Sequence, residues 1–267
     1  MPDLTRILSA TVPLTLASVA RGAQPLVLGD LARAAKGRAV FIAPDDAAMR
    51  AIAESAPFFA PDLEVVEYPA WDCLPFDRAS PALSVSARRL AALQKLQHRR
   101  DGPINAVLQR ALTPFRIRES TRLLTPGVEI GRESLIALLQ RQGYSRTDTV
   151  VDAGEYAVRG SIFDIFPSGL DHGLRLDFFG DELESLRLFD PNTQRSVQPV
   201  ETHLLLPASE ALLHEDSIKR FRRRYRELFG ANATGDPLYQ AVSDGRRLAG
   251  MEHWLPLFED RLVTLFD

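Results

Sequence analysis

The sequence has 267 residues, of which 45% are hydrophobic and 25% charged, and its formal net charge is -3. This composition is typical of a folded globular protein and excludes collagen-like, disordered and low-complexity chains. The length suits one large domain or two smaller ones, and the slight excess of acid argues against a nucleic-acid-binding surface that covers the whole chain.

The sequence carries no signature of export or of membrane insertion. Its one cysteine, Cys73, cannot form an internal disulfide bond. No apolar run approaches the roughly 20 residues that cross a bilayer. We therefore expect a cytoplasmic protein with no membrane contact.

Up to about residue 110, helical segments alternate with short apolar runs, a pattern typical of a parallel sheet covered on both faces. Residues 39–43 predict a buried strand, Asp45 and Asp46 a turn and N-cap for a helix that runs to about Ser55, and residues 63–68 the next strand. Together these segments predict a βαβ unit.

A further helix is expected to begin at Ser84 or Ser86 and to end near Asp101 and Gly102. After about Leu112 the pattern changes.

The middle region reads as a helix followed by strands. Residues 134–142 form an amphipathic helical pattern closed by Gly143, a residue favoured after a helix end. Residues 149–200 alternate as strands do and are interrupted by turn sequences. The pattern predicts an antiparallel sheet with one helix.

The last region returns to mixed α/β. Residues 203–206 predict a strand, and Asp216 or Ser217 is expected to cap a helix that ends at Gly230. The apolar stripe of that helix consists of Ile218, Phe221, Tyr225 and Leu228. A parallel-type region, an antiparallel region and a second mixed region together suggest a domain split by an insertion.

The first region has no phosphate cradle. A P-loop needs glycines for close backbone approach, a lysine for the phosphates and Ser or Thr for the metal. After the segment Gly22 to Gly29, Asp30 and Leu31 occupy the positions at which a P-loop has its lysine and its Ser or Thr. An acid at the lysine position repels phosphate. No Gly-x-Gly-x-x-Gly motif supports dinucleotide binding.

The histidines and acids give no metal site or nucleophile at a recognisable spacing. Cys73 lies in an apolar stretch flanked by Pro75 and reads as a packing residue. Residues 181–184 carry three acids beside a turn and read as a solvated hairpin tip, with a catalytic carboxylate pair as the minority interpretation. The scattered histidines are His98, His172, His203, His214 and His253.

One helix is strongly basic. The run consists of Lys219, Arg220, Arg222, Arg223, Arg224 and Arg226. A solvated polar face is the favoured interpretation, and a contact with the DNA backbone is the alternative, because clustered arginines neutralise phosphates.

Residues 154–167 hold most of the information. Read as one continuous strand, they place Arg159 and Phe163 on the same face. An arginine and an aromatic residue so placed can anchor a protein partner. The alternative, equally supported by the pattern, is that Phe163 is a core residue and Arg159 lies at its margin.

Several separated stretches resemble one family. The segments Gly154 to Pro167 and Leu174 to Pro191 are similar to the UvrB-homology module of bacterial transcription-repair coupling factors. Three shorter stretches agree: Trp71 to Phe76 with Ser80-Pro81, Gln194 to Ser196, and Gly250 to Phe258. They cover nearly the whole chain in the order found in the family.

The resemblance implies an α/β fold with two domains. The first is a degenerate helicase-type (P-loop-like) parallel-sheet domain formed by residues 1–112 and 198–267. The second is a smaller α+β antiparallel-sheet domain, residues 113–197, inserted between them. In this family the inserted domain docks UvrA, the damage-recognition ATPase of nucleotide excision repair, on a surface for which UvrB competes.

The matching positions imply three UvrA contacts, Arg146, Arg159 and Phe163, whereas Ala157 stands where UvrB has another arginine. The resemblance further implies a module without catalysis or cofactor of its own, since the nucleotide site is erased. ATP and Mg²⁺ are expected only in the translocase motor of the full-length family, together with contacts to RNA polymerase and double-stranded DNA.

The chain departs from the family in two places. The chain is shorter than expected between Arg100 and Asn105, and it ends at Asp267, before the polymerase-binding and motor domains, as an N-terminal fragment would. The alternatives to an adaptor are a UvrB-type helicase or nucleotide-binding module and a DNA-binding module.

Overall fold

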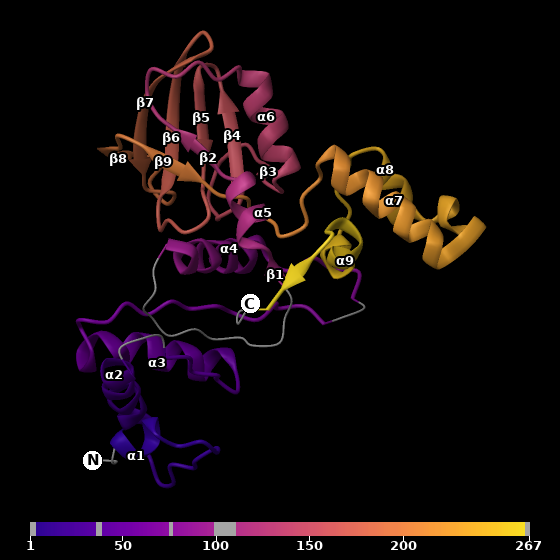
Figure 1. Ribbon diagram of the computed structural model, residues 1–267. Helices are drawn as coiled ribbons and strands as arrows, with labels where there is room; N and C mark the ends of the chain where they lie inside the picture. The colour runs from indigo at the N-terminus through magenta and orange to yellow at the C-terminus, as the bar shows by residue number, and fades with distance from the viewer. Residues whose placement is uncertain (1–3, 36–38, 75–76, 99–110, 265–267) are drawn as a thin grey trace. The chain divides into compact units, whose positions relative to one another are not determined.

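The computed structural model describes residues 4–35, 39–74, 77–98 and 111–264. Their packing separates two compact units, which are described here one at a time. The described residues from 4 to 70, together with 92–98, form the first unit, and residues 71–91 and 111–264 form the second. Figure 1 follows the chain through both units.

The first unit is helical in its described residues. It contains α1 (Leu4–Leu8), a short 3-10 turn (Arg21–Ala23), α2 (Gln24–Ala35), α3 (Asp46–Phe59) and the end of α4 (Leu83–His98). The predicted cap of α3 is confirmed, because the backbone N–H of Ala48 donates to the Asp45 carboxylate at 2.7 Å. The helix runs one turn past Ser55 and includes Pro57 in its last turn.

The strands predicted over residues 39–43 and 63–68 do not form. Residues 39–43 have no regular structure, and only Val66 of the second segment makes a β-bridge. No named strand of the described residues pairs with either segment. Both segments instead line an apolar pocket with α2 and α3. The helix predicted from Ser84 or Ser86 starts at Leu83, and its predicted end near Asp101 lies outside the described residues.

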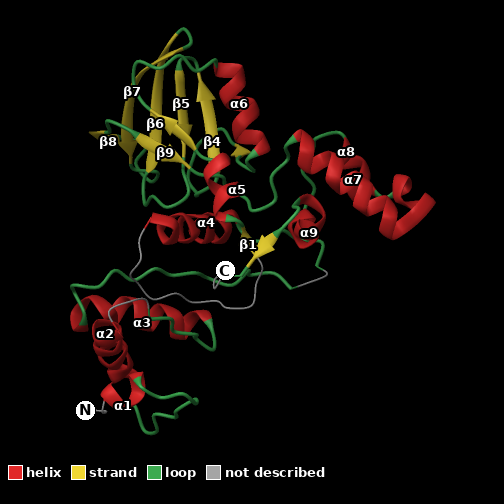
Figure 2. Ribbon diagram, viewed as in Figure 1, coloured by secondary structure: helices red, strands yellow, loops and turns green. Residues whose placement is uncertain are grey.

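The second unit is built around a six-stranded sheet, as Figure 2 shows. Its strands, in spatial order, are β3 (Ser145–Arg146), β4 (Glu155–Arg159), β5 (Ile162–Ile165), β6 (Gly173–Phe179), β7 (Glu182–Phe189) and β8 (Ser196–Pro199). All neighbouring pairs are antiparallel except β3 with β4, which is parallel. The antiparallel sheet predicted for this region is confirmed.

The predicted helix of this region is α6 (Arg132–Arg141), which begins two residues earlier than expected. Gly143 follows it with φ of +90°, and a Cβ at this position would lie 2.5 Å from the Cβ of Ser209. Both the left-handed backbone and the close approach therefore require glycine there.

Two antiparallel ribbons complete the strands of this unit. β2 (Arg122–Leu124) pairs with β9 (His203–Leu205), and β1 (Ala111–Leu112) pairs with β10 (Leu262–Val263). The strand predicted over 203–206 is thus present, and its partner lies within the predicted insert, so this pairing crosses the expected boundary at 197/198. The protein has an α/β fold with mixed and antiparallel sheets.

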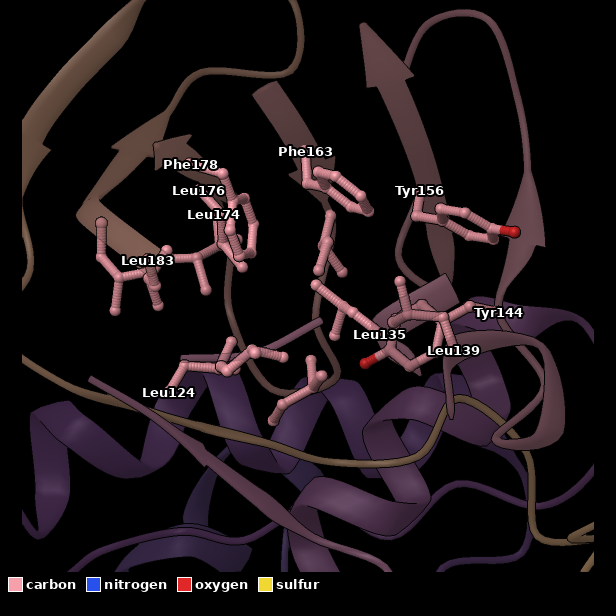
Figure 3. Packing of buried hydrophobic residues seen from close by; sticks show 14 of the residues in the cluster. Leu124, Leu135, Leu139, Tyr144, Tyr156, Phe163, Leu174, Leu176, Phe178 and Leu183 are labelled. Carbon is pink, nitrogen blue, oxygen red and sulfur yellow. The ribbon is translucent and has the colours of Figure 1, made fainter. Parts of the chain in front are cut away.

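The core of this unit lies between one face of the sheet, α6 and the β2–β9 ribbon. Leu135 and Leu139 of α6 pack against Tyr156, Phe163 and the leucines of β6, with Leu124 below them (Figure 3). The residues predicted to share a face of β6, Leu174, Leu176 and Phe178, are all buried in this cluster. The apolar alternation of the strands therefore determines which face of the sheet is interior.

The C-terminal part of the unit is helical. It contains α7 (Glu215–Phe229), a 3-10 turn (Gly230–Gly235), α8 (Pro237–Ser243), a 3-10 turn (Met251–Trp254) and α9 (Leu255–Phe258). The short helix α5 (Pro114–Glu119) instead precedes the sheet. α7 begins after His214, whose N–H donates to the Ser217 hydroxyl at 2.9 Å.

The apolar stripe predicted for α7 is only partly buried. Phe221 and Tyr225 are interior, whereas Leu228 is exposed, because Phe229 packs on Tyr225 and Trp254 in its place. No helix in the described part of the chain combines the length and the apolarity needed to cross a bilayer.

Candidate partner-binding site

The segment read as one strand from the sequence is a hairpin. Arg159 of β4 pairs with Ile162 of β5, which leaves Gly160 and Ser161 in the turn. Gly160 has φ of +63°, as the first central residue of a tight hairpin turn of this kind requires. Opposed residues of an antiparallel pair share a face, so Arg159 lies on the same face as Asp164, and Phe163 lies on the other.

Phe163 is therefore a core residue. Its side chain is 0% exposed, its ring lies 5.1 Å from that of Phe178, and the Arg132 guanidinium lies 5.6 Å from its ring centroid. The prediction that Phe163 shares a face with Arg159 is wrong, because the two-residue turn reverses the alternation after Arg159, and the alternative of a core position holds. Phe163 has no surface with which to touch a partner.

Arg159 is half exposed and tied to a buried acid. Its side chain is 50% exposed, whereas that of Asp164 is 0% exposed, and Nη2 of Arg159 donates to Oδ2 of Asp164. Arg175 of β6 binds the same carboxylate, with Nε 2.7 Å from Oδ1 and Nη2 3.0 Å from Oδ2. One interior carboxylate thus holds two guanidinium groups on the outer face of the sheet.

Arg175 is fixed on every side. Its guanidinium lies 4.9 Å from the ring centroid of Phe189, and Nη1 donates to the backbone carbonyl of Gln194 at 3.3 Å. The hydrogen bond to Asp164 raises the pKa of the Arg175 guanidinium above its ordinary value. The segment Gln194 to Ser196, singled out by the family resemblance, therefore supports the outer face of the sheet.

Arg146 lies on the opposite side of the sheet from Arg159. It is exposed on β3, the edge strand, and its register partner is the buried Tyr156. It thus faces the α6 side, and within the described residues it has no acidic partner. The structure places both predicted arginines near the β3–β4 edge without joining them, so a partner that contacts both must straddle that edge.

Sequence reasoning missed two residues here. Asp164 is an acid within an apolar strand, which is a signal for a buried ion pair, but its arginine partners depend on strand register. Phe179, at the end of β6, is 79% exposed despite its size. The β4–β5 turn lies beside it, because the N–H of Phe178 donates to the carbonyl of Ser161 at 3.1 Å.

The other stretches of resemblance come together away from this face. Ser80 donates to Glu252 at 2.5 Å, and the indole N–H of Trp71 donates to Glu210 at 3.1 Å. Glu210 is buried and paired with the buried Arg89, with 2.5 Å between Oε1 and Nε. These contacts bring together stretches of resemblance that are distant in the sequence, through the buried acids Glu210 and Glu252.

Cys73 has the character of a packing residue, as predicted. It is half-buried, burial raises the pKa of its thiol, and its Sγ lies 3.9 Å from Nε2 of His253. A raised pKa disfavours the thiolate that a nucleophile needs. No three metal-ligating side chains gather among the residues that the structure describes, and the side chain of His98 lies outside them.

The segment examined for a phosphate cradle is helical. Gly22 lies in the 3-10 turn, and Gly29, Asp30 and Leu31 are inside α2. A P-loop presents the backbone N–H groups of a loop to phosphate, whereas those of a helix interior are already engaged.

The basic residues of α7 divide into two sets. Arg220 donates to the carbonyl of Phe258 at 2.5 Å and Arg224 to that of Glu259 at 2.5 Å, so these two hold the C-terminal segment. The exposed set is Lys219, Arg222, Arg223 and Arg226. Lys219 and Arg223 form long ion pairs one turn away on the same helix, at 3.8 and 3.9 Å, and Nε of Arg226 donates to the carbonyl of Arg222 at 3.2 Å.

Comparison with known proteins agrees with the geometry. Residues 123–210, which contain α6 and the whole six-stranded sheet, match the family model described as the UvrB interaction domain.

Three curated relatives match nearly the whole chain. The transcription-repair-coupling factor of Haemophilus influenzae is 35% identical over 259 residues, which is 94% of this chain and 22% of that protein. The corresponding proteins of Escherichia coli and Myxococcus xanthus are 35% and 33% identical, and each match covers 90% of this chain and 21% of the relative. The chain thus spans about a fifth of the length of these relatives. The resemblance read from the sequence is confirmed: the chain carries a UvrB interaction domain and is a relative of the transcription-repair-coupling factors.

Proposed function

We propose that this chain is a non-catalytic adaptor that docks UvrA through the outer face and the β3–β4 edge of its sheet. In the longer relatives this module would recruit UvrA to an RNA polymerase stalled at a lesion, in transcription-coupled nucleotide excision repair. The observation that carries the proposal is the position of Arg159 within the UvrB interaction domain. Its side chain is half exposed, and the buried carboxylate of Asp164 holds it at the surface.

The arrangement suits a protein interface better than a catalytic site. A guanidinium fixed by one bond can offer its remaining N–H groups to a partner at little further cost in side-chain entropy. Arg146 supplies a second, freely exposed cation at the same edge of the sheet. Truncation of such a charged anchor typically weakens binding by about 1 to 3 kcal/mol.

The direct test is calorimetric titration of the 267-residue chain with purified UvrA. Saturable binding that UvrB displaces supports the proposal, because the two proteins would use equivalent surfaces. Absence of binding, or binding that UvrB leaves unchanged, contradicts it.

The finer architecture is also a proposal. Residues 1–112 and 198–267 would form a degenerate helicase-type domain around the insert 113–197, unable to hydrolyse ATP. ATP and Mg²⁺ would serve only the motor of the longer relatives, which would also contact RNA polymerase and duplex DNA in the cytoplasm. A fluorescent ATP analogue tests the host domain: micromolar binding to this chain would contradict the proposal.

A second candidate function has one observation in its favour. Lys219, Arg222, Arg223 and Arg226 are exposed at successive turns of α7, within about 100° of arc. Such a stripe suits the phosphates of duplex DNA, and the rings nearest to it, Tyr225 and Phe229, pack on each other instead of offering a stacking platform.

Salt dependence tests this second candidate. The logarithm of the affinity for duplex DNA falls with the logarithm of the salt concentration, and each lost phosphate contact makes this slope shallower by about 0.9. If the stripe binds duplex DNA, the Arg222→Glu/Arg226→Glu double variant should reduce the slope by about 2. An unchanged slope would dispose of the stripe as a DNA contact.

A further inference from the structure

Asp164 is the one acid of β5. Its side chain is 0% exposed on the outer face of the sheet, where Arg159 and Arg175 pair with it. A carboxylate moved out of water is costly unless it is paired and hydrogen-bonded. The strand therefore keeps a charge that packing alone would exclude.

Arg175 already satisfies that charge. Its Nε and Nη2 reach the two carboxylate oxygens at 2.7 and 3.0 Å, which is the bidentate geometry that pairs best. The second arginine, Arg159, is not needed to neutralise the acid. Its bond to Oδ2 instead fixes the direction in which an otherwise mobile, half-exposed side chain points.

We propose that Asp164 is a positioning residue for partner recognition: it sets the Arg159 guanidinium in its binding pose before the partner arrives. This inference rests on the proposed function, because it assumes that Arg159 contacts UvrA. Fixing a long side chain in advance removes an ordering cost from the binding step. Loss of the bond should therefore weaken binding about three- to tenfold.

The same geometry defines the partner group. One N–H of Nη2 of Arg159 is engaged with Asp164, which leaves its second N–H and those of Nε and Nη1 as donors. Arg175 lies on the same face, and the exposed Arg187 lies opposite it in the register of β6 and β7. The remaining N–H groups belong to a charged guanidinium, which pairs best with a carboxylate, so the group that Arg159 receives is an aspartate or glutamate of the partner.

A double-mutant cycle tests the positioning role in the 267-residue chain. The affinity for UvrA is measured by calorimetry for the native chain, Asp164→Asn, Arg159→Ala and the double variant. Asp164→Asn should weaken binding three- to tenfold when Arg159 is present and should have no effect in the Arg159→Ala background. Equal losses in both backgrounds would show that Asp164 acts only through the fold.

The cycle has a matched control and a fallback. Asp171→Asn, in the exposed β5–β6 loop, should leave affinity unchanged. Because Asp164→Asn leaves two arginines without their acid, its folding is checked by thermal unfolding. If it does not fold, Asp164→Glu, which keeps the charge and moves it by one methylene, replaces it in both arms with the same expectation.

A spectroscopic measurement separates this inference from the function beneath it. The side-chain Nε–H of Arg159 in the free protein should be ordered in the native chain and mobile in the Asp164 variant, as measured by NMR relaxation. A mobile Arg159 in the native chain would overturn positioning even if Arg159→Ala weakens UvrA binding. If Arg159→Ala binds UvrA with the native affinity, Arg159 is not part of the UvrA site. The positioning role of Asp164 then fails as well, whatever the NMR measurement shows.

Discussion

Two regions of the second unit are rich in arginine, and they use it differently. On α7, Arg220 and Arg224 donate to backbone carbonyls of the C-terminal segment, and the other basic residues extend into solvent. On the outer face of the sheet, Arg159 and Arg175 share one buried carboxylate. The number of arginines is greater on α7, but the exposed Arg223 and Arg226 pair only with groups of their own helix, whereas Arg159 is held by a buried carboxylate of the neighbouring strand. Order, rather than charge density, is what makes the sheet the better protein-binding candidate.

The largest expected effect is on stability, and it comes from removing one of the two arginines that pair with Asp164. Arg175→Ala leaves the buried Asp164 with one surface arginine, so we expect the free energy of unfolding to fall by about 3 kcal/mol, near the low end for a broken buried pair. Urea unfolding measures the change. The matched change Arg224→Ala on α7 should cost less, because the carbonyls it releases can bind water. Equal losses would contradict the contrast between the two regions.

The next largest effect is a loss of folding stability at low pH. His203, on β9 beneath the sheet, is largely buried, its Nε2 has no hydrogen-bond partner within the described structure, and burial lowers its pKa to about 4. In the unfolded chain the pKa of His203 is near its ordinary value of 6.5, so below that pH the unfolded state binds more protons than the folded state does. Stability is therefore full above pH 6.5 and is lost as the pH falls toward 4, by about 2 kcal/mol.

Thermal unfolding of the native chain and of His203→Leu between pH 7 and pH 4.5 checks this expectation. The variant should lose the part of the pH dependence that His203 contributes. Identical pH profiles for the two proteins would show that His203 is protonated in the folded state without cost.

The smallest expected effect concerns the edge of the sheet. Arg146 is exposed and has no ion-pair partner within the described residues, so its side chain must be ordered when a partner binds. We expect Arg146→Ala to weaken UvrA binding by about 1 kcal/mol, at the low end of the range for interface anchors. A loss larger than that of Arg159→Ala would reverse the ranking of the two arginines.

The sheet could be predicted from the sequence because its strands alternate. Leu174, Leu176 and Phe178 of β6 are interior, as their spacing predicts. The orientation of Arg159 and Phe163 could not be predicted without the position of the turn. The alternation of residues 154–167 predicts one continuous strand, whereas the two-residue turn at Gly160-Ser161 moves every later residue to the other face.

Other features depend on contacts distant in sequence. Asp164 and Arg175 are eleven residues apart, and β2 and β9 are joined across nearly eighty residues, so no local pattern predicts either pairing. In the first unit, residues 39–43 have the apolar composition of a strand and yet are irregular. Composition indicates which segments favour burial, but it does not determine that a buried segment forms a strand.

The most direct measurement of the central claim is the affinity of UvrA for Arg159→Ala, compared with the native chain and with Arg226→Ala on α7. All three should unfold at similar urea concentrations, since a half-exposed ion pair contributes no more than about 1 kcal/mol. The account predicts a loss of about 1 to 3 kcal/mol of binding free energy for Arg159→Ala and none for Arg226→Ala. Native affinity in Arg159→Ala, or an equal loss in both variants, would contradict it.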